Sequence, residues 1–318
     1  MPHPAPQSAA ELEDQLSAPP DDLVQSLAKL EGDIAFVGVG GKMGPTMARM
    51  ARRALDAAGV KRRVFGVARF SNQKTRERLE GWGIETVACD LLAEDATDKL
   101  PDAAHVVSMS GFKFGASQNP SYSWAMNCYV PAVVCRRYRA SQIVAFSSGN
   151  VYPLVPLERS PGLPHLGSVE TDPLGPVGEY AMTALGRERI YDHFSRVLNI
   201  PMAILRLNYA TELRYGVLVD LAQQVFAEQP IDISMARVNV LWLADANAMT
   251  LRAFAHASSP ARVINLAGAE ILSLREVAVQ LGQLMGKRVN FVGQESTSAL
   301  LNDGRSGYDL LGQPTADA

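Results

Sequence analysis

Three glycines near the start of the chain have the spacing of a phosphate-binding turn. They are Gly38, Gly41 and Gly44, and they directly follow a short apolar run over residues 34–37. Glycines at this spacing let the backbone turn sharply and approach a pyrophosphate, and a helix that begins there presents unpaired N–H groups to the negative charge. An ordinary strand-to-helix turn is the alternative, but the order of strand, turn and helix favours a dinucleotide site.

The end of the next apolar run indicates which dinucleotide binds. Residues 64–68 are predicted to form a second strand, and Arg69 follows it. An acidic residue at this place binds the ribose 2′-hydroxyl of NAD, whereas an arginine accommodates the 2′-phosphate of NADP. We therefore expect NADP in preference to NAD. Lys42, inside the glycine turn, is expected to add a second cation to the cofactor site, and its neighbour Met43 is expected to contact the cofactor as well. A solvated arginine on a loop is the alternative.

Two further strand ends supply residues that can line the same site. Asp90 and Leu91 end a predicted strand over residues 85–91 and are expected to meet the adenine. Ser110 and Gly111 end the following strand, where small side chains let a cofactor lie close to the backbone.

Strands and helical patterns alternate through the first two thirds of the chain. This alternation predicts an α/β fold with a doubly wound parallel sheet of the Rossmann type, and its ligand should lie at the carboxyl ends of the strands. Beyond about residue 210, short helices and strands alternate without a linker, which indicates a smaller, interleaved C-terminal substrate-binding part. The expected divisions are an N-terminal arm with a short helix (1–31), the dinucleotide-binding domain (32–209) and the substrate-capping part (210–318).

Composition narrows the class of partner. The 318 residues carry a formal net charge of -3, and 20% of them are charged, so no strong field favours nucleic acid or an anionic membrane. The three cysteines have no CxxC spacing, which indicates reduced thiols and no metal site. Residues 1–20 lack the basic and apolar regions of a secretory signal, and we expect them to form a loose arm. The sequence contains no apolar run long enough to span a bilayer. We therefore expect a cytoplasmic protein with a small-molecule substrate.

With these residues in place, the chain resembles an extended short-chain dehydrogenase/reductase of the NAD(P)-dependent epimerase/dehydratase family. The resemblance covers roughly residues 33–286. The segments that carry it occur in the family's order: the glycine turn, Asp90-Leu91, Asn127, Ser147-Ser148-x-x-Val151-Tyr152, Tyr180, Arg206 and Trp242-Leu-Ala-Asp245-Ala-Asn247.

The resemblance implies an enzyme, an NAD(P)-dependent oxidoreductase or epimerase acting on a hydroxyl or keto carbon of a sugar-like substrate. It implies that Ser148 polarises the substrate oxygen, that Tyr180 exchanges the proton and that Asn127 belongs to the cofactor site. Taken alone, Ser148 also fits a hydroxyl that ties down a loop, and Tyr180 fits a half-buried aromatic at a helix start. Family members often dimerise through four helices, so a homodimer is possible through helices 123–139 and 180–197.

The chain departs from the family four residues after the tyrosine, where the family has a lysine that binds the nicotinamide ribose and this chain has Ala184. Residues four apart share a helix face, so a lysine there would stand beside Tyr180 and stabilise a phenolate. An unperturbed tyrosine is only about one part in a thousand ionised at neutral pH. Lys113 or Arg187 is a candidate substitute cation, although the helix phase makes Arg187 remote from the tyrosine.

The missing lysine leaves two other functions open. A sensor or regulatory protein that binds NADP and has lost catalysis is one alternative, and Ala184 favours it. A non-redox isomerase or lyase that uses Tyr180 on the same fold is the other.

Overall fold

The computed structural model describes residues 5–157 and 167–316. The chain divides into two compact units. The first holds residues 1–148, 177–206 and 247–264, and the second holds residues 149–176, 207–246 and 265–318. None of the helices in the described part of the chain combines the length and the apolar character that crossing a bilayer requires.

A seven-stranded sheet organises the first unit, in the order β12-β7-β5-β4-β1-β2-β3. Its strands are β1 (Ile34–Val37), β2 (Val64–Ala68), β3 (Glu85–Ala88), β4 (His105–Ser108), β5 (Gln142–Ser148), β7 (Met202–Leu207) and β12 (Arg262–Leu266). β1 pairs in parallel with β2 on one side and with β4 on the other, and the next pairs outward, β2 with β3 and β4 with β5, are also parallel. The doubly wound parallel sheet predicted from the sequence is confirmed.

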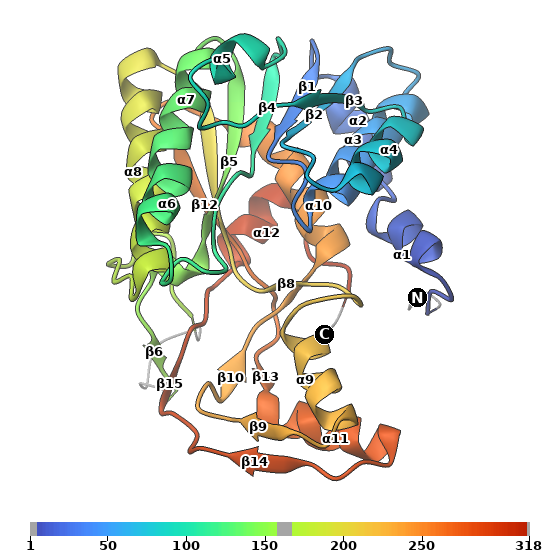
Figure 1. Cartoon of the computed structure of the whole chain (residues 1–318), viewed down its shortest axis with the longest axis vertical. Coiled ribbons are helices and arrows are strands. Elements are labelled where there is room, and N and C mark those ends of the chain that lie inside the picture. The colour runs from blue at the N-terminus through green and yellow to red at the C-terminus, as the bar shows by residue number, and fades with distance from the viewer. Residues whose placement is uncertain (1–4, 158–166, 317–318) are drawn as a thin grey trace. The chain divides into compact units, whose positions relative to one another are not determined.

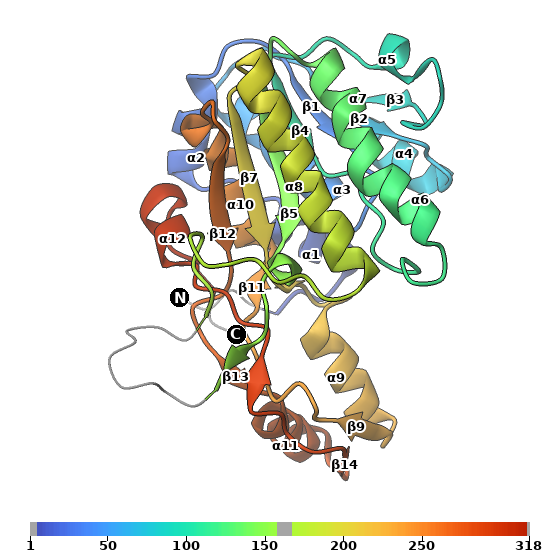
Figure 2. The ribbon, with the colours of Figure 1, turned by 90° about the vertical axis from the view of Figure 1, so that its left-hand side faces the viewer.

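Helices cover both faces of this sheet (Figure 1, Figure 2). They are α1 (Ala9–Leu16), α2 (Asp21–Ala28), α3 (Gly44–Ala57), α4 (Gln73–Gly81), α5 (Ala96–Lys99), α6 (Pro120–Trp124), the π-helical turn η1 (Ala125–Tyr129), α7 (Val130–Arg137), α8 (Glu179–Leu198), α10 (Leu243–Arg252) and the 3-10 turn η3 (Ala253–His256). α6, α7 and α8 lie together on one face, and α2, α3 and α4 lie together on the other (Figure 1). In a sheet of this kind a ligand binds at the carboxyl ends of the strands.

The arm expected at the N-terminus contains a packed helix. Ser8 caps α1 by accepting a hydrogen bond from the Glu11 N–H, and Leu12 and Leu16 are buried. Asp14 also forms an ion pair of 2.5 Å with Arg49 of α3. The expectation of a loose arm is therefore wrong, because two leucines four residues apart form an apolar stripe that α1 buries.

The second unit is built from short elements. They are η2 (Gly149–Val151), β6 (Val155–Pro156), β8 (Ala210–Thr211), α9 (Val217–Phe226), β9 (Pro230–Asp232), β10 (Arg237–Val238), β11 (Leu241–Trp242), β13 (Leu272–Ser273), α11 (Leu274–Met285), β14 (Asn290–Val292), β15 (Ser298–Ala299) and α12 (Arg305–Leu311). α9 and α11 contribute Leu221, Val225 and Leu274 to its apolar core, together with Ile231 of β9.

Candidate functional site

Two of the three turn glycines have no room for a side chain. Gly38 has a φ of +95°, and a Cβ there would lie 2.5 Å from the hydroxyl oxygen of Ser110. A Cβ at Gly44, the first residue of α3, would overlap the carbonyl oxygen of Val39. Both glycines are therefore required by the fold, Gly38 for the turn and Gly44 for the close approach of α3.

Gly41 is different, because the space beside it is open. The nearest atom to a Cβ there would be the carbonyl oxygen of Gly38, at 3.8 Å. Met43 occupies the N-cap position of α3 and has no side-chain oxygen with which to cap the helix. The turn therefore combines an open approach to the backbone with the N–H groups of a helix start, and this combination fits a pyrophosphate.

A cavity of about 270 Å³ in the first unit lies against this turn. The predicted site residues that line it are Gly38, Gly41, Arg69, Asp90, Leu91, Ser110 and Gly111. Arg69 and Asp90 are the charged side chains of its lining. Three strand ends and the glycine turn thus meet at one space. The other predicted cofactor residues, Lys42, Met43, Gly44 and Asn127, lie outside its lining.

The cavity also has polar lining residues that the sequence analysis did not identify. Ser71, Asn72 and Thr75 follow Arg69 in the loop after β2 and in the first turn of α4. Asn72 caps α4 by accepting a hydrogen bond of 3.0 Å from the Lys74 N–H. An asparagine before a helical pattern is a recognised cap, so this signal was present in the sequence.

Asn127 holds a loop and does not reach into the cavity. Its Oδ1 accepts the N–H of Phe112 at 2.9 Å, and its Nδ2 donates to the carbonyl oxygen of Phe112 at 2.9 Å and to Oγ1 of Thr183 at 2.8 Å. The side chain is fully buried within the π-helical turn η1. Such turns often occur at functional sites. Here the turn orients the side-chain amide of Asn127, and the hydrogen bonds of this amide connect the segment after β4 to α8.

The two serines at the end of β5 have different surroundings. Ser147 donates a hydrogen bond of 2.5 Å to Oε1 of Glu188, which also binds Arg206 through two contacts of 2.9 Å. Glu188 and Arg206 are both buried. Ser147 therefore belongs to a buried ion-pair cluster. Ser148 is the last residue of β5, at the carboxyl end of the strand where a ligand is expected.

Tyr180 lies in the first turn of α8 and is half-buried. The side chain of Ala184 is fully buried. A cation nevertheless lies over the tyrosine: Nζ of Lys113 is 5.3 Å from the centroid of the Tyr180 ring. This lysine comes from the segment after β4 and not from the helix of the tyrosine, and its side chain is exposed.

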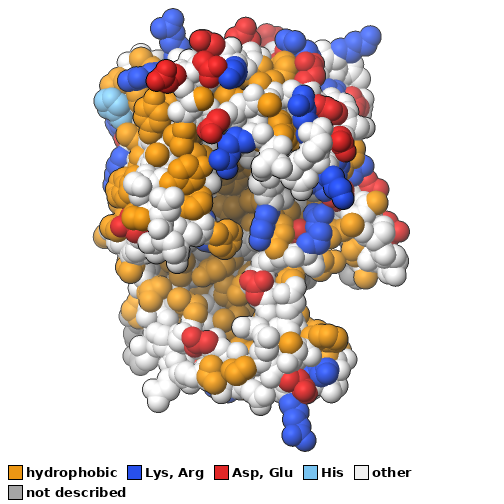
Figure 3. All heavy atoms as spheres, viewed as in Figure 1, with side chains coloured by type: hydrophobic (Ala, Val, Ile, Leu, Met, Phe, Trp, Pro, Cys, Tyr) orange, Lys and Arg blue, Asp and Glu red, His pale blue; other side chains and the backbone are white. Residues whose placement is uncertain are grey.

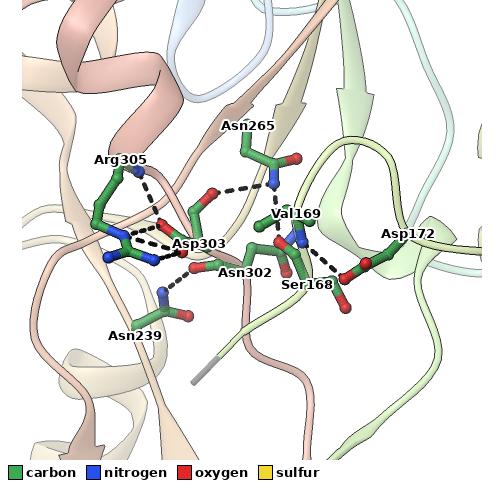
Figure 4. Close-up of polar contacts among 8 residues, drawn as sticks. All are labelled: Ser168, Val169, Asp172, Asn239, Asn265, Asn302, Asp303 and Arg305. Atoms are coloured by element: carbon green, nitrogen blue, oxygen red, sulfur yellow. Dashed lines mark hydrogen bonds and ion pairs between the residues drawn. The ribbon is translucent and has the colours of Figure 1, made fainter. Parts of the chain in front are cut away.

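In the second unit, a polar network fixes the backbone that follows β5. Asn265 donates to the carbonyl oxygens of Ser168, at 2.9 Å, and Asp303, at 3.0 Å (Figure 4). Gly149 lies against the buried amide of Asn302, since a Cβ at this glycine would be 2.8 Å from the amide oxygen. The residue after Ser148 must therefore be glycine.

A larger cavity, of about 620 Å³, also lies within the second unit. Its lining is mostly apolar and includes Leu218, Phe226, Trp242 and Met285. Among the described residues, Glu212 is the charged residue of the lining, and Arg214 pairs with this carboxylate at 2.9 Å. The described lining is therefore suited to uncharged groups.

Comparison with known proteins identifies the family. The model of the NAD dependent epimerase/dehydratase family matches residues 37–211. Among curated proteins, none matches the chain. A solved structure with a similar fold is a UDP-glucuronic acid 4-epimerase from Bacillus cereus in complex with UDP-glucuronic acid and NAD, at 18% identity and a TM-score of 0.73, covering 90% of this chain and 95% of that one.

Two other solved structures are similar to a comparable degree. RMD from Pseudomonas aeruginosa complexed with NADPH is 17% identical, with a TM-score of 0.68 and coverage of 90% of this chain and 95% of that one. A putative epimerase from Burkholderia cenocepacia J2315 is 18% identical, with a TM-score of 0.69 and coverage of 91% and 94%. Since the family model matches more than half of its residues, this chain belongs to the NAD dependent epimerase/dehydratase family, a family of enzymes that use a nicotinamide dinucleotide.

Proposed function

We propose that this enzyme is an epimerase or oxidoreductase that acts on a hydroxyl or keto carbon of a sugar nucleotide, with a nicotinamide dinucleotide as its cofactor. The observation that carries the proposal is the cavity in which Arg69, Asp90 and the backbone of Gly41 line one space. Similar solved structures hold NAD with UDP-glucuronic acid in one case and NADPH in another, and these ligands support the cofactor and substrate class.

The dinucleotide is held by groups that converge on the glycine turn. Its pyrophosphate meets Gly38, Gly41, Gly44 at the start of α3, and the two residues before that helix, Lys42 and Met43. Asp90 and Leu91 meet the adenine, and Ser110 and Gly111 form the wall along which the cofactor extends. When bound, the nicotinamide ring supplies hydride transfer.

Ser148 and Tyr180 carry the proton chemistry in this proposal. The Ser148 hydroxyl donates a hydrogen bond to the reacting oxygen of the substrate. The Tyr180 hydroxyl gives a proton to that oxygen, or, in the reverse direction, the Tyr180 phenolate removes one. Asn127 acts indirectly, because its amide fixes the segment after β4 on which Lys113 lies over the tyrosine.

Arg69 is expected to set the cofactor preference. Calorimetric titration should show tighter binding of NADP than of NAD, and Arg69→Ala should weaken NADP binding by roughly tenfold or more, because a charge-assisted contact to the 2′-phosphate is lost. NAD binding should change little. Lys74→Ala is the matched control, since Lys74 is an exposed cation outside the cavity lining. Equal affinities of the wild type for NADP and NAD would refute the role of Arg69.

Gly41 and Gly44 should respond differently to the same added methyl group. Gly41→Ala should leave the thermal unfolding temperature nearly unchanged but weaken dinucleotide binding, because the methyl group occupies the open space beside the turn. Gly44→Ala should lower the unfolding temperature, because its methyl group overlaps the carbonyl oxygen of Val39. Wild-type dinucleotide affinity in Gly41→Ala would place the pyrophosphate elsewhere.

A binding protein without catalysis is the second candidate, and the buried Ala184 favours it because α8 carries no lysine beside Tyr180. The two functions separate when the purified chain is incubated with NADP or NAD and with UDP-glucose or UDP-glucuronic acid. An epimerised or oxidised sugar supports the enzyme. Tight dinucleotide binding with no product from any sugar nucleotide supports a sensor.

Homodimerisation stays a prediction. Hydrophobic side chains gather over α6 and α8 (Figure 3), and the exposed ones there include Trp124, Tyr129 and Met182. An apolar surface of this kind is typical of a contact between copies.

A further inference from the structure

Arg187 is a buried cation in the middle of α8. Its residue is 5% exposed. One terminal nitrogen donates to the carbonyl oxygen of Phe146 at 3.1 Å, and the other donates to Oδ1 of Asn127. The third nitrogen, Nε, is buried and has no hydrogen-bond partner within the described part of the chain. The sequence predicts that Arg187 is remote from Tyr180, but the burial of this arginine gives it a different significance.

The charge of Arg187 has no counter-charge among the described residues. Its neighbour Glu188 is engaged by Arg206 and Ser147. Arg187 interacts electrostatically with the thiol of Cys128 and the phenol of Tyr191, and burial raises the pKa of both groups above the usual range. Both groups are therefore neutral at physiological pH. A buried charge without a counter-charge is unfavourable, so an anion bound near Arg187 would stabilise it.

This charge lies directly behind the wall of the dinucleotide cavity. Gly111 lines the cavity, and a Cβ at this position would overlap the guanidinium of Arg187. Only the backbone of one glycine therefore separates the cation from the space proposed for the cofactor. In a poorly solvated interior a charge acts at this range with little screening.

Arg187 is also connected to the helix turn that carries Tyr180. Asn127, which accepts from Arg187, donates to Oγ1 of Thr183 at 2.8 Å, and this hydroxyl donates to the carbonyl oxygen of Tyr180 at 2.9 Å. Arg187 is seven residues after Tyr180, so the two lie on the same face of α8, and helical side chains lean toward the N-terminus. The small side chain of Ala184 lies between them in sequence.

Lys113 is the competing source of positive charge, since its ammonium lies over the Tyr180 ring. Its side chain is exposed, however, and water and salt screen an exposed charge strongly. The buried guanidinium is the stronger electrostatic element of the two.

We propose that Arg187 supplies a buried positive charge to the dinucleotide cavity: its charge, which has no counter-charge among the described residues, stabilises the pyrophosphate of the bound dinucleotide across the backbone of Gly111. The inference rests on the proposed function. Arg187 is a positioning residue in this proposal, because it acts through the backbone of Gly111 and through Asn127.

The test compares dinucleotide affinity in three variants by calorimetry, using whichever of NADP and NAD the wild type binds more tightly. Arg187→Met keeps the length of the side chain and removes its charge, and it should weaken binding by roughly tenfold or more. Arg187→Lys keeps a charge and should retain most of the affinity. Arg189→Met, which removes an exposed arginine from the same helix, is the matched control and should bind as the wild type does.

The unfolding temperature of each variant separates an electrostatic role from a structural one. Arg187→Met should bind dinucleotide more weakly without a large fall in the unfolding temperature, because it removes a buried charge that has no counter-charge among the described residues. If Arg187→Met does not fold, Arg187→Gln removes the charge instead, and the double variant Ala184→Lys/Arg187→Gln, which restores a cation to the same face of α8, should bind dinucleotide more tightly than Arg187→Gln.

Three results would overturn the inference. The first is a dinucleotide affinity of Arg187→Met within about twofold of the wild type. The second is an equal loss of affinity in Arg187→Lys, and the third is no gain of affinity from the restored lysine. Failure of the wild type to bind either dinucleotide would instead refute the proposed function. The two failures are therefore distinguishable.

Discussion

Replacing Tyr180 by phenylalanine is expected to lower turnover of a sugar nucleotide by about a thousandfold, the usual scale for loss of a general acid or base. The ring keeps its place in the first turn of α8, and only the hydroxyl that exchanges the proton is removed. Dinucleotide affinity should stay near that of the wild type, because Tyr180 is not part of the cavity lining at the glycine turn. Steady-state turnover and calorimetry on the same preparation measure both quantities.

Tyr129→Phe is the control for this prediction, because it makes the same chemical change at an exposed tyrosine of η1. It should leave turnover unchanged. An unaffected rate in Tyr180→Phe would remove the tyrosine from the mechanism. A rate lost together with dinucleotide binding would show that the substitution had disturbed the cofactor site.

The local pattern was sufficient to predict the strands and the glycine turn. β1 and β2 begin and end at the predicted residues, because each is a short apolar run whose residues are almost all buried. Helix positions were predicted less well where packing decides them. The segment 123–139, expected to be one helix, contains the π-helical turn η1. This turn holds Asn127, which makes two hydrogen bonds to the backbone of Phe112, 15 residues earlier in the chain.

The candidate site was only partly predictable for a related reason. Residue type and order indicated Arg69 and Asp90, which do line one cavity. The resemblance indicated Ser148 as the serine of the site, but the sequence did not show that Ser147 binds Glu188, because this partner lies 41 residues away on α8. The burial of Arg187 was also not predictable, because nothing in its immediate sequence shows that Phe146 and Asn127 enclose it.

The largest effect on stability is expected at the ion pair between Glu188 and Arg206. Both side chains are buried, and the carboxylate also accepts the hydroxyl of Ser147. Glu188→Ala leaves the buried guanidinium of Arg206 without the carboxylate of Glu188, so the free energy of unfolding should fall by about 3–5 kcal/mol. Urea denaturation measures this as a lower midpoint with an unchanged slope.

A matched pair on the same helix shows whether burial causes the loss. Asp192 and Arg196 form an exposed ion pair of 3.0 Å on α8, and Asp192→Ala should change the unfolding midpoint little, because solvent screens the pair. The double variant Glu188→Leu/Arg206→Met removes both buried charges and should recover much of the stability lost in Glu188→Ala. If Glu188→Ala is no more damaging than Asp192→Ala, the buried pair does not hold β5 and β7 against α8.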